Sequence, residues 1–316
     1  MKPALAEDYV EEKLKFPYIV MPKIDGVRGL NLTGAFTGRS LKAFKNRYVT
    51  KQFSHSALLG FDGEVAAHSE THPDLCRITT SRLNTIQGEP YVLWWLFDYV
   101  SMDTKILPYI VRLRERDKRY DELYWNEHTR PLWNHLRLVP WELVENLEQL
   151  LAAEARFLAE GYEGLILRSP EKPHKDGRSS PTHNGYLRIK RFIDFEFHID
   201  GIEEGRTNAN EAQINELGNT FRSTHEENML PNGQVGCLIG RAVKDVFDPQ
   251  THKLLIAQNQ FVKVSAGTMD APTRKLYFEN PSLILHKIGK AKFFPKGMKD
   301  APRFPVFQGL RAEEDM

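Results

Sequence analysis

Apolar residues in the first part of the chain gather in short runs that are bounded by turn formers. Runs rich in branched and aromatic residues, at this length, are typical of strands. Four such strands are predicted, over residues 18–21, 61–66, 91–99 and 164–168.

Two helices are predicted beside these strands. One covers residues 147–160, with Asn146 placed to cap its first turn and Gly161 to end it. Its leucines share one helical face: Leu147, Leu150, Leu151 and Leu158. The other helix is expected through residues 111–124. The first part of the chain is therefore mixed α and β.

The pattern changes after Asp194. Residues 171–184, rich in Pro, His, Ser, Lys and Gly, are expected to form an exposed loop between two strands. Beyond residue 194, short strands are predicted over 196–203, 234–242, 254–264 and 304–310. Many short strands with Gly, Asn and Pro turns predict a small antiparallel barrel, and an OB-type barrel is the common choice for nucleic-acid binding. Two domains are expected, 1–194 and 195–316.

The net charge of the chain does not indicate a function, so only local clusters of charged residues are informative. The 43 Lys and Arg nearly balance the 42 Asp and Glu of the 316 residues, giving a formal net charge of +1. Any nucleic-acid contact must therefore come from clusters. One cluster is Arg188, Lys190 and Arg191; the other, mixed with Phe293 and Phe294, is Lys287, Lys290, Lys292, Lys296, Lys299 and Arg303. A solvated face is the alternative interpretation of the second cluster.

Cysteine usage and apolar stretches bear on the compartment. Cys76 and Cys237 are not at metal-ligand spacing, so neither a disulfide framework nor a structural zinc site is predicted. No apolar leader follows Met1, and no stretch approaches the ~18 uncharged residues of a membrane span. We expect a cytoplasmic monomer without membrane contact.

The strongest candidate chemistry lies between Lys23 and Arg28. An amine attacks the α-phosphorus of a nucleotide only when it is deprotonated, so the pKa of Lys23 is expected to fall from ~10.4 through partial burial and the charge of Arg28. Asp25 can orient the lysine or a sugar hydroxyl, and Gly26 allows a tight turn. The alternative is a β-hairpin that turns at Asp25-Gly26 between the flanking apolar stretches.

Other residues suited to phosphate chemistry lie elsewhere in the chain. Glu64 follows an Asp-Gly pair and Glu163 precedes a glycine, so both are candidates for holding a divalent metal, with simple turns as the alternative. Phe97 can stack on a nucleobase, although an aromatic residue in such a run is usually core. Arg188 and Lys190 alternate with apolar residues and would share one strand face, suited to phosphate or simply solvated.

In chain order these segments resemble the motif series of the covalent nucleotidyltransferase superfamily, and in particular the compact ATP-dependent DNA ligases of bacteriophages and algal viruses. The matching segments are Lys23-Ile24-Asp25-Gly26-Val27-Arg28, Gly38-Arg39-Ser40, Asp62-Gly63-Glu64, Leu96-Phe97-Asp98, Glu163 to Arg168, and Leu187 to Lys190. The closing segment, Lys299 to Phe307 with Arg311 beyond, is similar to the end of the ligases' OB domain. The resemblance covers nearly the whole chain.

The resemblance implies an α+β nucleotidyltransferase fold with antiparallel sheets and flanking helices, followed by a C-terminal OB barrel. It also implies a three-step reaction that serves DNA replication, repair or recombination. Lys23 takes AMP from ATP, the AMP passes to the 5'-phosphate of a nick in duplex DNA, and the 3'-hydroxyl displaces it.

The resemblance further implies roles for individual residues. Glu64 and Glu163 would hold Mg2+, for which Mn2+ is expected to substitute. The implied ATP contacts are Met21 (adenine edge, through its main chain), Phe97 (stacking), Lys23, Arg28, Arg39, Glu64, Arg188, Lys190 and Arg303 (pyrophosphate). DNA contacts are expected from Lys287, Lys290, Lys292 and Lys296.

Two positions depart from the family pattern, and two other functions stay open. Arg188 and Arg168 stand where lysine is usual; arginine keeps the charge but cannot donate a proton, so a clamping role for Arg188 is favoured. An RNA ligase or a GTP-using capping enzyme shares the lysine motif, although the Arg-Phe-Pro ending favours DNA. A noncatalytic OB-fold nucleic-acid-binding protein would not need Lys23, Glu64 and Glu163 together.

Overall fold

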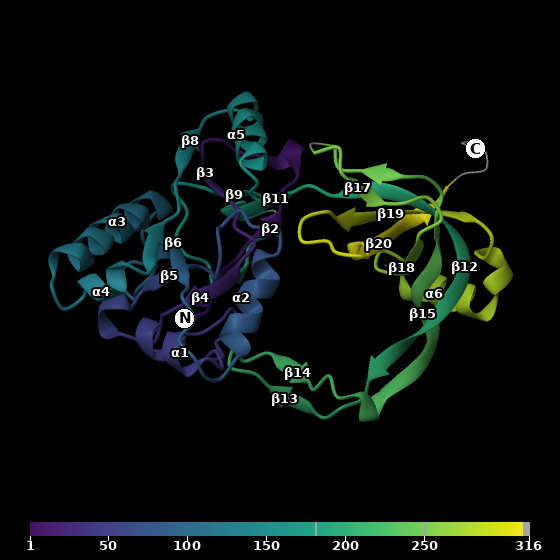
Figure 1. Cartoon of the computed structure of the whole chain (residues 1–316), viewed down its shortest axis with the longest axis horizontal. Helices are drawn as coiled ribbons and strands as arrows, with labels where there is room; N and C mark the ends of the chain where they lie inside the picture. The colour runs from purple at the N-terminus through teal and green to yellow at the C-terminus, as the bar shows by residue number, and fades with distance from the viewer. Residues whose placement is uncertain (181, 250, 312–316) are drawn as a thin grey trace. The chain divides into compact units, whose positions relative to one another are not determined.

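The computed structural model describes residues 1–180, 182–249 and 251–311. The chain divides into two compact units, Met1–Lys190 and Arg191–Met316, so the division lies close to residue 194, where the sequence pattern changes (Figure 1).

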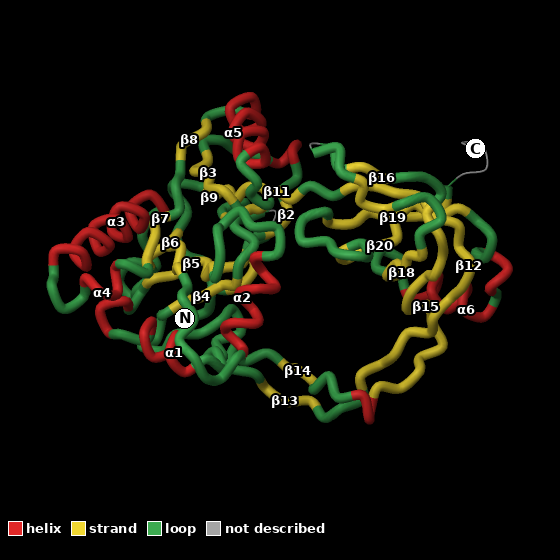
Figure 2. Tube along the Cα trace, in the orientation of Figure 1, coloured by secondary structure: helices red, strands yellow, loops and turns green. Residues whose placement is uncertain are grey.

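The first unit is built on two mostly antiparallel sheets (Figure 2). One has the strand order β2 (Glu7–Asp8), β11 (Tyr186–Lys190), β9 (Gly164–Arg168), β3 (Tyr18–Pro22) and β8 (Glu142–Val144). The other has the order β4 (Val27–Leu30), β5 (Phe61–Ala66), β6 (Leu93–Tyr99) and β7 (Leu136–Leu138). Two short strands, β1 (Ala4–Leu5) and β10 (Gly177–Arg178), pair in parallel. The four strands predicted in this part are confirmed, with ends shifted by up to two residues.

Helices flank these sheets. They are α1 (Arg47–Phe53), α2 (Leu75–Asn84), α3 (Tyr109–Trp125), α4 (Arg130–Trp133) and α5 (Leu147–Ala159). The Asn146 cap of α5 is confirmed, because its side chain accepts a hydrogen bond from the Gln149 N–H at 2.9 Å. The predicted leucine face is partly wrong, because Leu151 is 43% exposed. The buried positions of α5 are Leu150, Ala153, Glu154 and Phe157.

Strand β3 is buried on both faces and delivers the chain to Lys23. Tyr18 and Val20 pack in the core under α5, whereas Ile19 and Met21 pack in a second core with residues of α2 and α3. This explains the continuous apolar run that predicted the strand. The hairpin alternative is wrong, because β3 pairs with β8 and β9 while β4 pairs with β5 in the other sheet.

The second unit is a ring of five strands in the order β12-β15-β18-β20-β19, which is the predicted barrel. These strands are β12 (Ile193–Asn208), β15 (Met229–Ala242), β18 (Phe261–Ser265), β19 (Ile288–Phe294) and β20 (Arg303–Leu310). The join between β18 and β20 consists of a single residue pair, Ser265 with Val306. Helix α6 (Ala271–Glu279) follows β18. The strand predicted over 254–264 is two strands, because a turn separates β17 (Leu254–Ile256), paired with β16 (Val246–Phe247), from β18.

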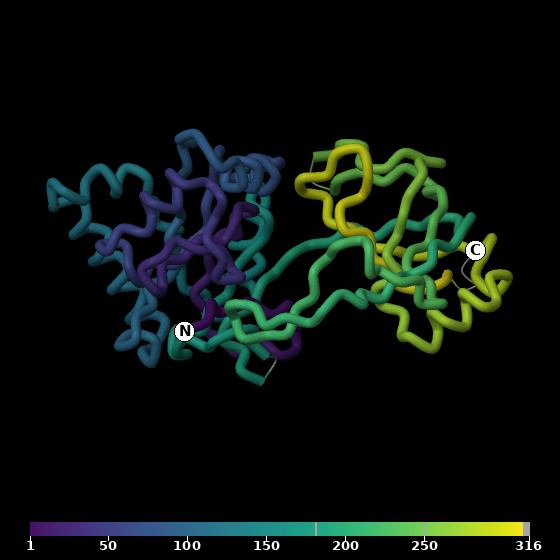
Figure 3. The backbone as a smooth tube through the Cα atoms, turned by 90° about the horizontal axis from the view of Figure 1, so that it is seen from below, coloured from purple at the N-terminus to yellow at the C-terminus, as the bar shows by residue number. Residues whose placement is uncertain are grey.

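Strands β12 and β15 continue beyond the ring as a two-stranded ribbon, which Figure 3 shows in teal and green. The pairing runs out to Asn208 and Met229, and the residues between them carry the small hairpin of β13 (Ala212–Ile214) and β14 (Thr220–Arg222). Across the described residues of both units, no helix is long and apolar enough to cross a membrane.

Candidate nucleotide site

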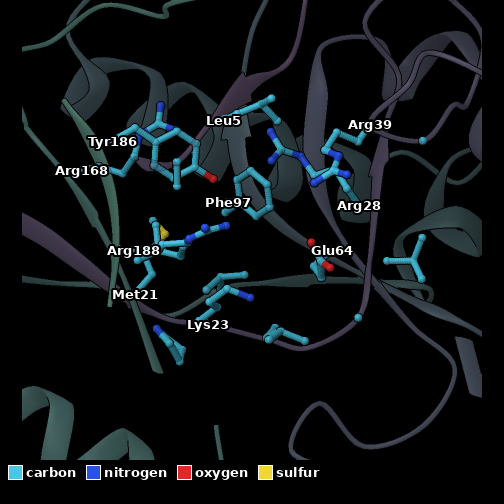
Figure 4. A pocket seen from close by; sticks show the side chains of 18 of the residues that line it. Leu5, Met21, Lys23, Arg28, Arg39, Glu64, Phe97, Arg168, Tyr186 and Arg188 are labelled. Atoms are coloured by element: carbon cyan, nitrogen blue, oxygen red, sulfur yellow. The ribbon is translucent and has the colours of Figure 1, made fainter. Parts of the chain in front are cut away.

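A cavity of about 580 Å³ opens in the first unit. Seven of the residues predicted to bind nucleotide line it: Met21, Lys23, Arg28, Arg39, Glu64, Phe97 and Arg188. Figure 4 shows these side chains around one space, with Leu5, Arg168 and Tyr186 beside them. Residues separated by more than 160 positions in the sequence are thus brought to one place, because β3, β9 and β11 are neighbours in one sheet.

Lys23 sits where the chain passes from one sheet to the other. Its N–H donates to the carbonyl of Gly164 at 2.9 Å, and its own carbonyl accepts from the N–H of Glu163 at 3.0 Å. Gly26 is required by close packing rather than by a turn, since a Cβ there would lie 2.3 Å from the Val65 carbonyl oxygen. The lysine is therefore fixed by main-chain bonds to β9 and by the contact of Gly26 with β5.

The Lys23 amine forms an ion pair and hydrogen bond with Glu163, whose side chain is 1% exposed. Lys190 binds the other carboxylate oxygen of Glu163 at 2.9 Å. Burial lowers the pKa of Lys23, but the charge and hydrogen bond of Glu163 outweigh it and hold the pKa above its usual value. The expected fall of the Lys23 pKa is therefore wrong for this state of the protein, because a buried carboxylate stabilises the ammonium form.

Glu64 also lines the cavity, and it pairs in register with Arg28 across β4 and β5. Burial raises the pKa of Glu64 to about 7, and Glu163 and Asp25 add to the rise while Lys23 and Arg28 oppose it. The Glu64 carboxyl therefore takes up a proton at a higher pH than an ordinary glutamate does.

Arg28 and Phe97 form one unit of the wall. The Asp62 carboxylate accepts from Arg28 Nε at 2.5 Å and from Nη2 at 2.6 Å, a two-bond geometry that fixes the guanidinium plane. That plane lies over the Phe97 ring, 4.6 Å from its centroid. Phe97 lines the cavity, in keeping with a stacking surface for a base.

Strand β11 alternates as predicted. Leu187 and Ile189 are buried in the core under α5, whereas Arg188 lines the cavity and Lys190 reaches Glu163. Arg39 is exposed at the rim of the cavity.

A buried network behind the cavity was not foreseen from the sequence. The Asp98 carboxylate accepts from Arg112 at 3.0 and 3.1 Å and from Arg168 at 2.8 Å. The Arg168 guanidinium lies 4.1 Å from the ring centroids of both Tyr109 and Tyr186. Tyr109 in turn donates its hydroxyl to the Phe97 carbonyl at 2.6 Å. A weak signal for this network was Arg112, a charged residue near the start of the predicted helix.

The remaining predicted residues belong to the barrel. Arg303 donates to the Lys296 carbonyl at 2.8 Å and lies 5.5 Å from the Phe294 ring centroid. Strand β19 turns Ala291 and Phe293 into the barrel core. We refer to Lys287, Lys290, Lys292 and Lys296 as the barrel lysines.

The donor set for a metal consists of carboxylates. In the described part of the chain, no group of three His, Cys, Asp or Glu residues could hold a metal ion by itself. Mg2+ commonly uses one or two carboxylates together with waters and substrate phosphates. The carboxylates of Glu64 and Glu163 are oxygen ligands of the kind that such a Mg2+ ion uses, and in this structure Glu163 is bonded to Lys23 and Lys190.

Comparison with known proteins bears on what the cavity serves. No protein-family model matches the chain. The DNA ligase of African swine fever virus (strain Badajoz 1971 Vero-adapted) is 33% identical over 64 residues, which is 20% of this chain and only 15% of that protein.

Solved structures align over almost the whole chain. The Chlorella virus DNA ligase-adenylate is 25% identical, with 99% of both chains covered and a TM-score of 0.53. A Lig E DNA ligase is 17% identical, with 98% of this chain and 99% of that chain covered and a TM-score of 0.67. The ATP-dependent DNA ligase of bacteriophage T7, in complex with ATP, is 14% identical over 98% of both chains, with a TM-score of 0.50.

The Lig E and T7 structures share the fold at identities that say nothing further, whereas the Chlorella virus enzyme adds sequence similarity along its full length. The α+β fold class with a C-terminal barrel is confirmed, and so is the resemblance stated from the motifs. With that similarity and the motif order in agreement, the chain resembles the Chlorella virus DNA ligase in both sequence and fold, with a mixed α+β first unit followed by a five-stranded barrel.

Proposed function

We propose that the chain is an ATP-dependent DNA ligase that seals nicks in duplex DNA through a lysyl-AMP intermediate. The observation that supports this most directly is the position of Lys23. Lys23 lines a cavity that also offers an aromatic surface at Phe97 and guanidinium groups at Arg28, Arg39 and Arg188. A purine nucleoside triphosphate needs both kinds of surface.

The reaction follows three displacements at phosphorus. Lys23 Nζ forms a bond to the α-phosphorus of ATP, and pyrophosphate leaves. The 5'-phosphate of the nick then attacks the same phosphorus, and the Nζ–P bond breaks. Finally the 3'-hydroxyl attacks the 5'-phosphorus, AMP leaves, and a phosphodiester is formed.

The residues of the site would orient the nucleotide and neutralise the charge of its phosphates. Phe97 would stack on adenine, and Met21 would read its edge through the main chain. Arg28, Arg39, Arg188 and Lys190 would contact phosphate or ribose, and Arg303 of the barrel would orient pyrophosphate.

Lys23 must also lose a proton before it attacks. Glu163 holds that proton on Nζ through the ion pair, so the lysine stays an ammonium ion until the carboxylate charge is offset. Glu64 and Glu163 would hold a Mg2+ ion, whose positive charge would offset that of the Glu163 carboxylate and so favour the neutral amine of Lys23.

We further propose that the reaction takes place in the cytoplasm. The chain would act as a monomer on nicked duplex DNA, and Mn2+ would be able to replace Mg2+. The two domains would have different roles: residues 1–194 would bind the nucleotide, and residues 195–316 would bind DNA.

The test is incubation with α-labelled ATP or GTP and Mg2+, followed by denaturing electrophoresis. Label from ATP should remain on the wild-type chain and be absent from Lys23→Ala. Lys118→Ala is the matched control, because that lysine is 66% exposed on α3. Sealing of a nicked DNA duplex and of a nicked RNA duplex is then compared. Label only from GTP, sealing only of RNA, or no label at all would reject the proposal in favour of a capping enzyme, an RNA ligase or a noncatalytic binding protein.

A further inference from the structure

The first residues of the chain are held along the nucleotide cavity as a strap, which we define as residues 2–9. Lys2 donates its N–H to Asp176 at 3.0 Å, and its carbonyl lies 2.9 Å from His174 Nε2. Strand β1 then pairs with β10, and β2 pairs with β11. The strap is therefore bound to the loop and strand that close one side of the cavity.

The strap also contributes to the wall of the cavity. Leu5 and Ala6 line it, and Figure 4 shows Leu5 beside Arg28. The Ala4 carbonyl accepts from Arg28 Nη2 at 3.3 Å, and the Ala6 carbonyl accepts from Arg178 Nη1 at 2.9 Å. Two arginines that line the cavity are thus held by main-chain oxygens of the strap.

A third cavity arginine is held by a charged side chain of the strap. Asp8 lies directly opposite Arg188 in the β2–β11 pairing. Its carboxylate accepts from Arg188 Nε at 2.6 Å and from Nη2 at 3.3 Å, and the Tyr9 N–H donates to the Arg188 carbonyl at 3.2 Å. Both the main chain and the guanidinium of Arg188 are therefore positioned by the strap.

Two bonds to one edge of a guanidinium fix the direction of its other edge. Arg28 shows the same arrangement with Asp62, so two arginines of the cavity are each oriented by a carboxylate. We propose that Asp8 is a positioning residue for Arg188, so that the strap sets the direction in which this guanidinium meets a phosphate during transfer of AMP. This inference rests on the proposed function.

The pair is exposed enough to be tested without unfolding the protein. The side chains of Arg188 and Asp8 are 35% and 64% exposed, and ion pairs at such positions contribute little to the stability of the fold. Substitution at Asp8 should therefore leave thermal unfolding unchanged and act on the reaction alone.

The experiment is a double-mutant cycle on lysyl-adenylate formation in the full chain. The variants are Asp8→Asn, Arg188→Lys and the two combined, with Asp8→Glu as the conservative variant and Asp121→Asn as a control on the exposed side of α3. The rate of label transfer from α-labelled ATP is measured over a range of ATP concentrations, which separates the maximal rate from the half-saturating concentration.

We expect Asp8→Asn to lower the maximal rate about tenfold while the half-saturating ATP concentration changes by less than about threefold, because the charge of Arg188 stays while its orientation is lost. Asp8→Glu should restore most of the rate. In the Arg188→Lys background, Asp8→Asn should change the rate by less than about twofold, because an ammonium ion has no fork to orient.

Two results would overturn the inference. One is an equal loss from Asp8→Asn in both backgrounds, which would indicate a general effect on the strap. The other is an Asp8→Asn variant that behaves like Asp121→Asn. A wild-type chain that takes no label would instead reject the proposed function, so the two failures are distinguishable.

Discussion

Asp98→Asn should be the most destabilising of the conservative substitutions around the cavity. Asp98 is 1% exposed and is bonded to Arg112 and Arg168, which are 0% and 4% exposed. The substitution leaves two buried guanidinium groups facing a neutral amide. Removing one partner of a buried ion pair typically costs about 3 to 5 kcal/mol of the free energy of unfolding.

The pKa of Asp98 gives an independent lower figure. Burial raises this pKa, but the charges of Arg112 and Arg168 outweigh it and bring the pKa down to about 2. Relative to the ordinary aspartate value of ~3.9, this shift corresponds to about 2 to 3 kcal/mol of unfolding free energy. The expected loss lies in the larger range, because the pKa of Asp98 does not count the cost of the two buried arginines left without a partner. For a domain of this size the melting temperature should fall by about 6 to 20 °C.

Tryptophan fluorescence isolates the unit in question. All five tryptophans belong to the first unit: Trp94, Trp95, Trp125, Trp133 and Trp141. Unfolding in urea followed at these residues therefore reports the unit that contains Asp98. Glu142→Gln is the matched control, because its pair with Arg156 is exposed and should contribute less than about 1 kcal/mol.

The pH dependence has a definite sign. The pKa of Asp98 is depressed in the folded protein, so its stabilisation is present above the unfolded value of ~3.9 and is lost as the pH falls toward 2. The difference in unfolding free energy between wild type and Asp98→Asn should thus shrink between pH 5 and pH 2. A loss no larger than that of Glu142→Gln at pH 7, or a difference that grows at low pH, would refute the reasoning.

Three further predictions concern the reaction. Tyr109→Phe removes the hydroxyl that donates to the Phe97 carbonyl at 2.6 Å. The half-saturating ATP concentration should therefore rise about 3- to 10-fold at an unchanged maximal rate, and kinetics equal to wild type would exclude Tyr109 from positioning Phe97. Glu163→Gln should lower adenylation at least about tenfold at limiting Mg2+, measured by Mg2+ titration, and a wild-type rate would contradict the metal role. Neutralising the barrel lysines should make nick binding less salt-dependent, by ~0.9 in the log–log slope for each phosphate that a removed lysine had neutralised, and an unchanged slope would show that they do not touch phosphate.

Much of the local structure follows from the sequence alone. The unbroken apolar run of β3 predicts that both of its faces are buried. The alternation of apolar and charged residues along β11 predicts which of its side chains point away from the core. The Asn146 cap of α5 depends on residues three positions apart and is equally local. The order of the motifs also carries the resemblance to DNA ligases, because each motif is a short segment that can be recognised without knowing what it touches.

Only the tertiary structure decides which of these segments meet. Lys23 and Glu163 are 140 residues apart, and Asp8 and Arg188 are 180 apart, so their pairing depends on strand order and register in a sheet. The raised pKa of Lys23 follows from such a pairing and reverses the expectation drawn from its neighbours in sequence. Periodicity predicts which face of an element is buried, but packing among strands distant in sequence determines which residues that face contacts. The pKa values of the charged groups in the site depend on those contacts.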